Sequence, residues 1–170
     1  MSRKRMSDLF IEDAHHLRAA KGWVELGNHV EAYHELEKIA PRNRTAPDVL
    51  EVRWQIYTLA GQHDCALPVA QALVKSAPDR YCGWIWVSHS LNELGRTKEA
   101  VESLLPAAKK FPTLGIIPFH IGFHYAALGH LHEAKVWLQC AFASPEAKQL
   151  KLKALEDPKL GKLWDQIGKL

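Results

Sequence analysis

The chain has 170 residues, of which 47% are apolar and 24% charged, and this is the composition of a globular domain with a substantial core. Such a composition excludes a disordered chain, and the lack of any long apolar run excludes a membrane-spanning protein. The net charge of +3 is too small for the continuous basic face that nucleic-acid binding needs, so we expect no nucleic-acid partner.

Residues 1–12 are expected to extend the first helix at its N-terminal side. Ser7-Asp8 offers a helix N-cap within this segment. The short apolar run that follows is interrupted by Glu12 and Asp13, so no secretory signal peptide is predicted. We therefore expect a soluble cytoplasmic protein.

Four glycines recur at a constant interval of 34 residues, and each is followed five residues later by an alanine. The two sets are Gly27, Gly61, Gly95 and Gly129, and Ala32, Ala66, Ala100 and Ala134. A constant interval without insertions predicts a repeat protein in which each unit packs on its neighbours. The four units that follow from it are residues 13–46, 47–80, 81–114 and 115–146.

Each unit is predicted to form two antiparallel helices joined by a short turn. Apolar residues recur at helical spacing before the glycine, as Leu50, Trp54 and Tyr57 do in the second unit. The glycine ends the first helix because it can adopt the left-handed conformation. The small alanine then lets the two helices approach each other closely beside the turn.

Residues 147–170 are expected to form helices that cap the fourth unit. Asp157-Pro158 is typical of an N-cap followed by the first residue of a helix. The final helix is amphipathic, and its apolar residues are Leu160, Leu163, Trp164 and Ile167. From the sequence, this helix either covers the apolar end of the stack or serves as a dimerisation or groove-filling element.

Residues 13–146 resemble the tetratricopeptide repeat (TPR) family. That family has a bulky residue at position four of each unit, a small one at eight, an aromatic one at eleven, glycine at fifteen, alanine at twenty and twenty-seven, and proline at thirty-two. Besides the glycines and alanines above, the residues that fit are Trp23, Tyr57, Tyr125, Trp84, Ala20, Gly122, Leu36, Leu104, Leu138, Ala107, Ala141, Pro78 and Pro112. Trp54 and Ser88 depart from the pattern at position eight. The resemblance implies an all-α fold, a right-handed α-solenoid of four helix-turn-helix hairpins.

The resemblance also implies a concave groove, lined by the first helix of each unit, that holds a peptide or helix of a partner protein. The residues that we expect to bind this partner are Lys21, Asp48, Glu51, Gln55, Ile85, His89, Asn92, Phe119 and Phe123. The groove is expected to be polar in its N-terminal half and apolar in its C-terminal half. Phe119 and Phe123 lie four apart on one helix as exposed aromatics, where they either anchor a partner helix or contact the chain's own last helix.

The function that the resemblance implies is a non-catalytic scaffold or adaptor. One subset of the family grips chaperone carboxyl termini with a lysine and an asparagine at positions five and nine of the first unit. Leu17 and Lys21 stand there in this chain, so this kind of binding is disfavoured. In size and helical content alone the chain also resembles type III secretion chaperones. Self-association through the C-terminal helix, which would give a homodimer, is a further alternative.

No cofactor, metal or catalytic site is predicted. The three cysteines are widely spaced, which favours neither a disulfide framework nor a structural zinc site. His120 and His124 lie four apart on one helix and His89 stands in the preceding unit, so a histidine metal site is a lesser alternative that needs a third ligand. No nucleophile elbow, phosphate-binding glycine loop or metalloprotease motif occurs.

Overall fold

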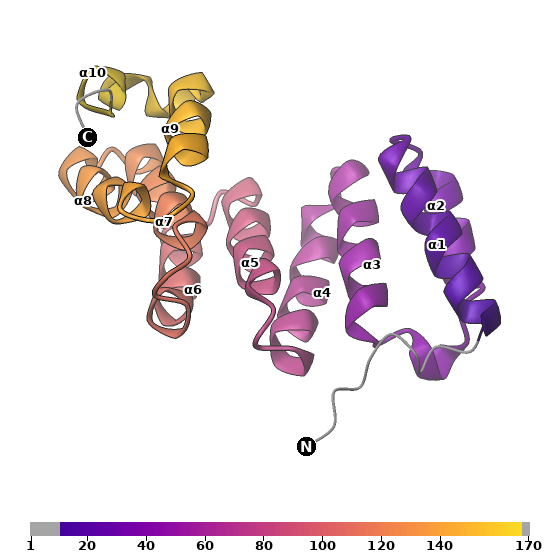
Figure 1. Cartoon of the computed structure of the whole chain (residues 1–170). Coiled ribbons are helices and arrows are strands. Elements are labelled where there is room, and N and C mark those ends of the chain that lie inside the picture. The colour runs from indigo at the N-terminus through magenta and orange to yellow at the C-terminus, as the bar shows by residue number, and fades with distance from the viewer. Residues whose placement is uncertain (1–10, 168–170) are drawn as a thin grey trace. The chain divides into compact units, whose positions relative to one another are not determined.

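The computed structural model describes residues 11–167, and within this range it contains helices and turns but no strand (Figure 1). The α-helices, in chain order, are α1 (Ile11–Glu25), α2 (His29–Glu37), α3 (Pro47–Leu59), α4 (His63–Ser76), α5 (Tyr81–Glu93), α6 (Thr97–Lys110), α7 (Ile116–Ala127), α8 (Leu131–Phe142), α9 (Ala147–Glu156) and α10 (Trp164–Ile167). The 3₁₀ segments of the described residues are η2 (Pro41–Asn43) and η3 (Pro158–Leu163). The N-cap predicted at Ser7-Asp8 lies outside the described residues.

Two compact units make up the chain, Met1–Trp86 and Val87–Leu170, and the boundary between them falls within α5. In the first unit α1 packs on α2 and α3 packs on α4, while α3 also contacts both α1 and α2. In the second unit α7 packs on α6 and α8, and the C-terminal elements add to this group because α9 contacts α8 and η3 contacts α7. The prediction of an all-α protein built from helical hairpins is confirmed.

The four repeated glycines end the first helix of each hairpin in the way predicted. Gly27, Gly61, Gly95 and Gly129 have φ of 73°, 69°, 75° and 81°, the left-handed conformation that a side chain disfavours. In each turn the amide of the residue after the glycine donates to the carbonyl of the residue five places before it, at 2.8–2.9 Å. The four pairs are Asn28 to Trp23, Gln62 to Tyr57, Arg96 to Leu91 and His130 to Tyr125. This is the Schellman motif, and it satisfies a terminal carbonyl of each first helix.

The four alanines that follow the glycines are fully buried, as their predicted packing role requires. Ala32, Ala66, Ala100 and Ala134 each have 0% of their surface exposed. The close approach of two helices is evident at Gly122 in α7, where an added Cβ would lie 3.0 Å from the Ala134 carbonyl oxygen and from Leu138 Cγ. Small residues on both sides of the hairpin are therefore needed for α7 and α8 to pack.

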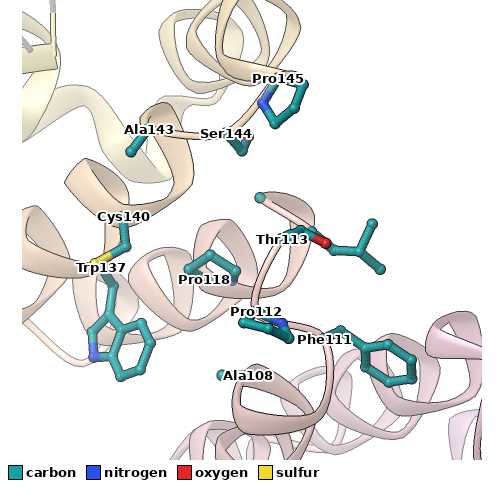
Figure 2. Close-up of a pocket in the computed structure, with 12 residues that line it drawn as sticks. Ala108, Phe111, Pro112, Thr113, Pro118, Trp137, Cys140, Ala143, Ser144 and Pro145 are labelled. Carbon is teal, nitrogen blue, oxygen red and sulfur yellow. The ribbon is translucent and has the colours of Figure 1, made fainter.

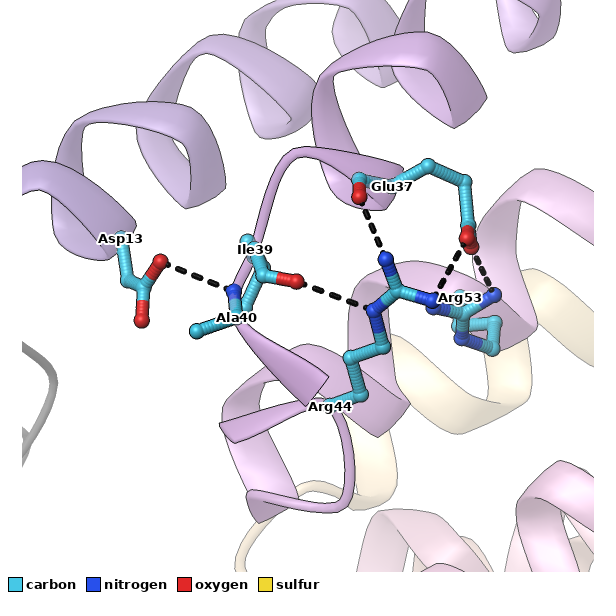
Figure 3. Close-up of polar contacts among 6 residues, drawn as sticks. All are labelled: Asp13, Glu37, Ile39, Ala40, Arg44 and Arg53. Carbon is cyan, nitrogen blue, oxygen red and sulfur yellow. Dashed lines mark hydrogen bonds and ion pairs between the residues drawn. The ribbon is translucent and has the colours of Figure 1, made fainter. Parts of the chain in front are cut away.

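Polar contacts hold the connection between α2 and α3 in place (Figure 3). The buried Asp13 carboxylate accepts a hydrogen bond of 3.0 Å from the Ala40 amide, and this bond lowers the pKa of Asp13 below its ordinary value. Arg44 donates to the Glu37 carbonyl at 2.6 Å, and the Glu37 carboxylate is paired with Arg44 at 2.9 Å and with Arg53 at 2.8 Å. These contacts fix how α3 follows the first hairpin.

The predicted final helix is an α-helix over only part of its length. The Asp157 side chain accepts a hydrogen bond of 2.9 Å from the Lys159 amide, so the predicted N-cap is confirmed. The segment that follows is the 3₁₀ segment η3, and the α-helix α10 covers only Trp164–Ile167. A 3₁₀ helix has three residues per turn, which places Leu160 and Leu163 on one face, and both are buried at 0% and 1% exposure.

Within residues 11–167, no helix has both the length and the apolar character needed to cross a membrane.

Candidate functional site

Four of the residues predicted to bind a partner lie together in one pocket of the second unit. These are His89 and Asn92 of α5, and Phe119 and Phe123 of α7. The pocket has a volume of about 240 Å³, and we call it the α5–α7 pocket. The remaining residues that line it are Glu93, His120, His124, Lys153, Asp157 and Lys159.

Two histidines of α7 are neutral in this pocket at pH 7. His124 is 2% exposed, and burial lowers its pKa to about 4, with further contributions from the neighbouring His89 and Lys159. Burial also lowers the pKa of His120 to about 3, and the charge of Lys153 adds to this effect. The lysine charges thus act on both imidazoles.

Two lysines from the C-terminal elements lie over the aromatic rings of α7. Lys153 of α9 has its Nζ 5.5 Å from the centre of the Phe119 ring. Lys159 of η3 has its Nζ 5.2 Å from the centre of the Phe123 ring. Both contacts are within the range of cation–π attraction, so each ammonium group is positioned by an aromatic face.

The expectation that Phe119 is exposed is wrong. Phe119 is 2% exposed and belongs to a core cluster that includes Ala154, Leu160 and Leu163 from the C-terminal elements. The apolar residues of α9 and η3 need a surface to pack on, and Phe119 provides it. The sequence left two roles open for Phe119, anchoring a partner helix or contacting the chain's own last helix. The structure shows Phe119 in contact with the chain's own C-terminal segment. Phe123 is half-buried against the same cluster and lines the pocket.

Charged residues of the C-terminal elements also line this pocket, and the sequence did not predict them. Lys153, Asp157 and Lys159 bring charges to the pocket, and they were missed because they lie beyond the last repeat, where the family pattern gives no groove positions. A signal for them exists in the sequence. The buried residues Leu150 and Ala154 of α9 mark the face that packs on the fourth hairpin, and Lys153 is adjacent to that face.

The predicted residues of the first unit have a different environment. Arg80 places its Nη1 2.7 Å from Asp48 Oδ1 and 2.6 Å from Glu51 Oε1, so one arginine pairs with both carboxylates. Burial alone would lower the pKa of Arg80, but these hydrogen bonds raise it above its ordinary value. Lys21 of α1, Gln55 of α3 and Ile85 of α5 are half-buried.

The histidine metal hypothesis gains no support from the geometry. The rings of His120 and His124 have centroids 6.4 Å apart. Across residues 11–167, no three or more His, Cys, Asp or Glu side chains are grouped so that they could hold a metal ion.

Two cavities with volumes above 400 Å³ are lined by none of the predicted binding residues. One, of about 450 Å³ in the second unit, is lined by Phe111 and Pro112 after α6, Pro118 of α7 and Trp137 and Cys140 of α8, among others (Figure 2). The other, of about 470 Å³ in the first unit, lies among α2, α3 and the start of α4. The first is mostly apolar and has no charged residue in its lining, so it offers less chemistry than the α5–α7 pocket.

The fold defined by these hairpins is that of a TPR-like helical repeat protein, and comparisons with solved structures agree. The TPR protein TTC0263 of Thermus thermophilus is 21% identical, with a TM-score of 0.71 over 92% of this chain and 83% of that one. A crystal structure of MamA is 16% identical, with a TM-score of 0.70 over 83% of this chain and 81% of that one. The MSR-1 form of MamA is 20% identical, with a TM-score of 0.66 over 85% and 79% of the two chains. No protein-family model and no curated protein sequence matches the chain.

Proposed function

We propose that the protein is a non-catalytic scaffold that binds a segment of a partner protein at the α5–α7 pocket. The observation that carries the proposal is the convergence of His89, Asn92, Phe119 and Phe123 on one pocket, from two first helices of successive hairpins. A pocket with aromatic walls and a few polar groups is typical of a site that anchors one or two side chains of a bound segment.

A peptide selection tests this proposal and does not require the partner to be identified. Peptides displayed on phage are selected against the full chain, and the affinities of the selected peptides are measured by fluorescence polarisation. The double variant His89→Ala with Asn92→Ala is expected to weaken their binding by at least about tenfold, because each loses a polar contact at the pocket.

A matched control removes two comparable polar side chains elsewhere. His132 and Gln139 are exposed on α8 and do not line the pocket, so His132→Ala with Gln139→Ala should leave binding unchanged. A selection that yields no binding peptide contradicts the proposal, and so does an equal loss of affinity in the two double variants.

Self-association is a second candidate function, and the exposure of α9 favours it. Leu152 and Leu155 are 55% and 41% exposed, and their spacing of three places them on one face of the helix. Leu160, Leu163 and Ile167 of η3 and α10 are buried within the chain, whereas Trp164 is 39% exposed, so the leucines of α9 form the larger exposed apolar surface. Light scattering on the full chain and on Leu152→Ser with Leu155→Ser compares their masses, and two equal monomer masses count against a dimer.

A further inference from the structure

Two lysine ammonium groups line the α5–α7 pocket without a direct ion-pair partner among residues 11–167. Lys153 and Lys159 each lie over an aromatic ring, and neither has a carboxylate within 4.0 Å among the described residues. A cation–π contact leaves most of the hydrogen-bond donors of the ammonium group available. The two lysines can therefore form ion pairs with an anionic group of a ligand.

The two carboxylates that line the same pocket keep their negative charge, but each accepts a hydrogen bond from a group other than a lysine ammonium. Asp157 Oδ1 accepts from the Lys159 backbone amide at 2.9 Å and so caps η3. Glu93 Oε1 accepts from the Asn92 side-chain amide at 3.3 Å. Neither carboxylate lies within 4.0 Å of Lys153 Nζ or Lys159 Nζ, so within the described residues the two ammonium groups have no direct ion-pair partner.

One pocket-lining residue has a buried nitrogen with no hydrogen-bond partner among the described residues. His124 Nε2 lies 3.4 Å from Ser88 Oγ, whereas His124 Nδ1 is buried and has no hydrogen-bond partner among residues 11–167. Leaving a buried polar atom without a hydrogen bond is unfavourable, and a ligand that bonds to it removes this cost. A neutral imidazole can present an N–H at this position, because the tautomer is free to follow the ligand.

We propose that the α5–α7 pocket binds the side-chain carboxylate of a glutamate or aspartate in the partner segment. Lys153 and Lys159 supply the counter-charges and His124 donates a hydrogen bond. The Phe119 and Phe123 rings pack against the methylene groups of the acidic side chain, and the volume of about 240 Å³ accommodates one such side chain. This assignment rests on the proposed function and names the chemistry of what the scaffold recognises.

The direct test uses small probes and the full chain. N-acetylglutamate α-amide carries the side-chain carboxylate, and N-acetylglutamine α-amide is its uncharged counterpart. Each is titrated while the side-chain NMR signals of His120 and His124 are followed. The carboxylate probe should bind with a dissociation constant on the order of 1 mM and raise the pKa of His124, because a nearby anion favours the protonated imidazole. The glutamine probe should bind at least about tenfold more weakly.

Charge variants show whether the two named lysines are responsible. Lys153→Met with Lys159→Met should abolish the response to the carboxylate probe. Lys148→Met with Lys162→Met removes two exposed lysines of the same elements that do not line the pocket, and it should leave the response unchanged. Equal responses to the two probes overturn the inference. So does an equal loss of the response to the carboxylate probe in the two double lysine variants. Tighter binding of inorganic phosphate than of the carboxylate probe overturns the choice of a carboxylate.

The failure of this inference can be told apart from the failure of the proposed function. If selected peptides bind at His89 and Asn92 but their affinity survives replacement of every acidic residue by its amide, the scaffold stands and the carboxylate assignment is wrong. If no peptide is selected while the carboxylate probe still titrates His124, the pocket chemistry stands and the scaffold proposal is wrong.

Discussion

The indole rings of Trp54 and Trp86 stack face to face, with their centroids 4.4 Å apart and their planes within 4° of each other. Trp54 stands in α3 at the repeat position where the TPR pattern has a small residue, and it is 8% exposed. Trp86 of α5 provides the surface that covers it. The departure from the family pattern is therefore compensated by a second large aromatic residue one helical hairpin later.

Replacing Trp54 with alanine should destabilise the protein strongly. The substitution removes a buried indole and leaves a cavity beside Trp86, a change that costs about 3–5 kcal/mol in protein cores. Urea unfolding followed by far-ultraviolet circular dichroism measures the loss. Leu59→Ala is the control, because Leu59 ends the same helix and is 46% exposed, and it should change stability by no more than about 0.5 kcal/mol. Similar losses in the two variants would mean that the stack contributes little.

Replacing a glycine by alanine should have opposite effects on stability in a turn and inside a helix. Gly61 has φ of 69°, so alanine there should destabilise by about 1–2 kcal/mol, since a Cβ is strained in the left-handed region. Gly22 lies inside α1, and a Cβ added to it meets no atom within 4 Å. Gly22→Ala should therefore stabilise by about 0.5–1 kcal/mol through the better helix propensity of alanine. Thermal unfolding of both variants checks the two signs, and a loss of stability in Gly22→Ala would contradict the argument.

The parts of the fold that depend on local backbone chemistry were predictable from the sequence. A glycine at φ near 70° and a fully buried alanine five residues later follow from the repeat itself, as at Gly61 and Ala66. The environment of Phe119 was not predictable, because it depends on which surface residues 147–167 pack against. Periodicity shows that those residues are amphipathic, but it does not show which helix they cover.

For the candidate site too, the sequence indicated the residues that belong to the repeats but not those that follow them. His89 and Asn92 were placed at the groove by their positions in the repeat, and they do line the α5–α7 pocket. The charge of that pocket comes from Lys153 and Lys159, which belong to no repeat and reach it through tertiary packing. A repeat pattern describes what each unit shares with the others and carries no information about a segment that follows the last one.

The C-terminal segment should be an integral part of the second unit's core. Leu163 of η3 is 1% exposed in the cluster that contains Phe119, so Leu163→Ala should cost about 2–5 kcal/mol. Leu155→Ala makes the same change at a position of α9 that is 41% exposed and should have little effect. Thermal unfolding distinguishes the two, and a small loss at Leu163 would show that the segment is not held as described.

Acidification should destabilise the protein through His120 and His124. Their folded pKa values of about 3 and 4 lie below the ordinary 6.5, so the unfolded chain binds more protons than the folded one between these limits. Stability should therefore fall as the pH is lowered from 6.5 towards 4, with a slope that approaches about 1.4 kcal/mol per pH unit for each histidine. The nearby Lys153 and Lys159 strengthen the effect because they oppose protonation.

Urea unfolding at several pH values between 5 and 6.5 measures this slope. Glu93 and Asp157 also line the pocket, so the comparison is made between variants that retain both carboxylates. His120→Gln with His124→Gln should flatten the slope, whatever it does to stability at pH 7, since neither position then gains a proton on unfolding. His34→Gln with His132→Gln changes two exposed histidines and should leave the slope as in the unaltered chain. A slope that is unaffected by the first pair would show that these buried imidazoles are not what couples folding to pH.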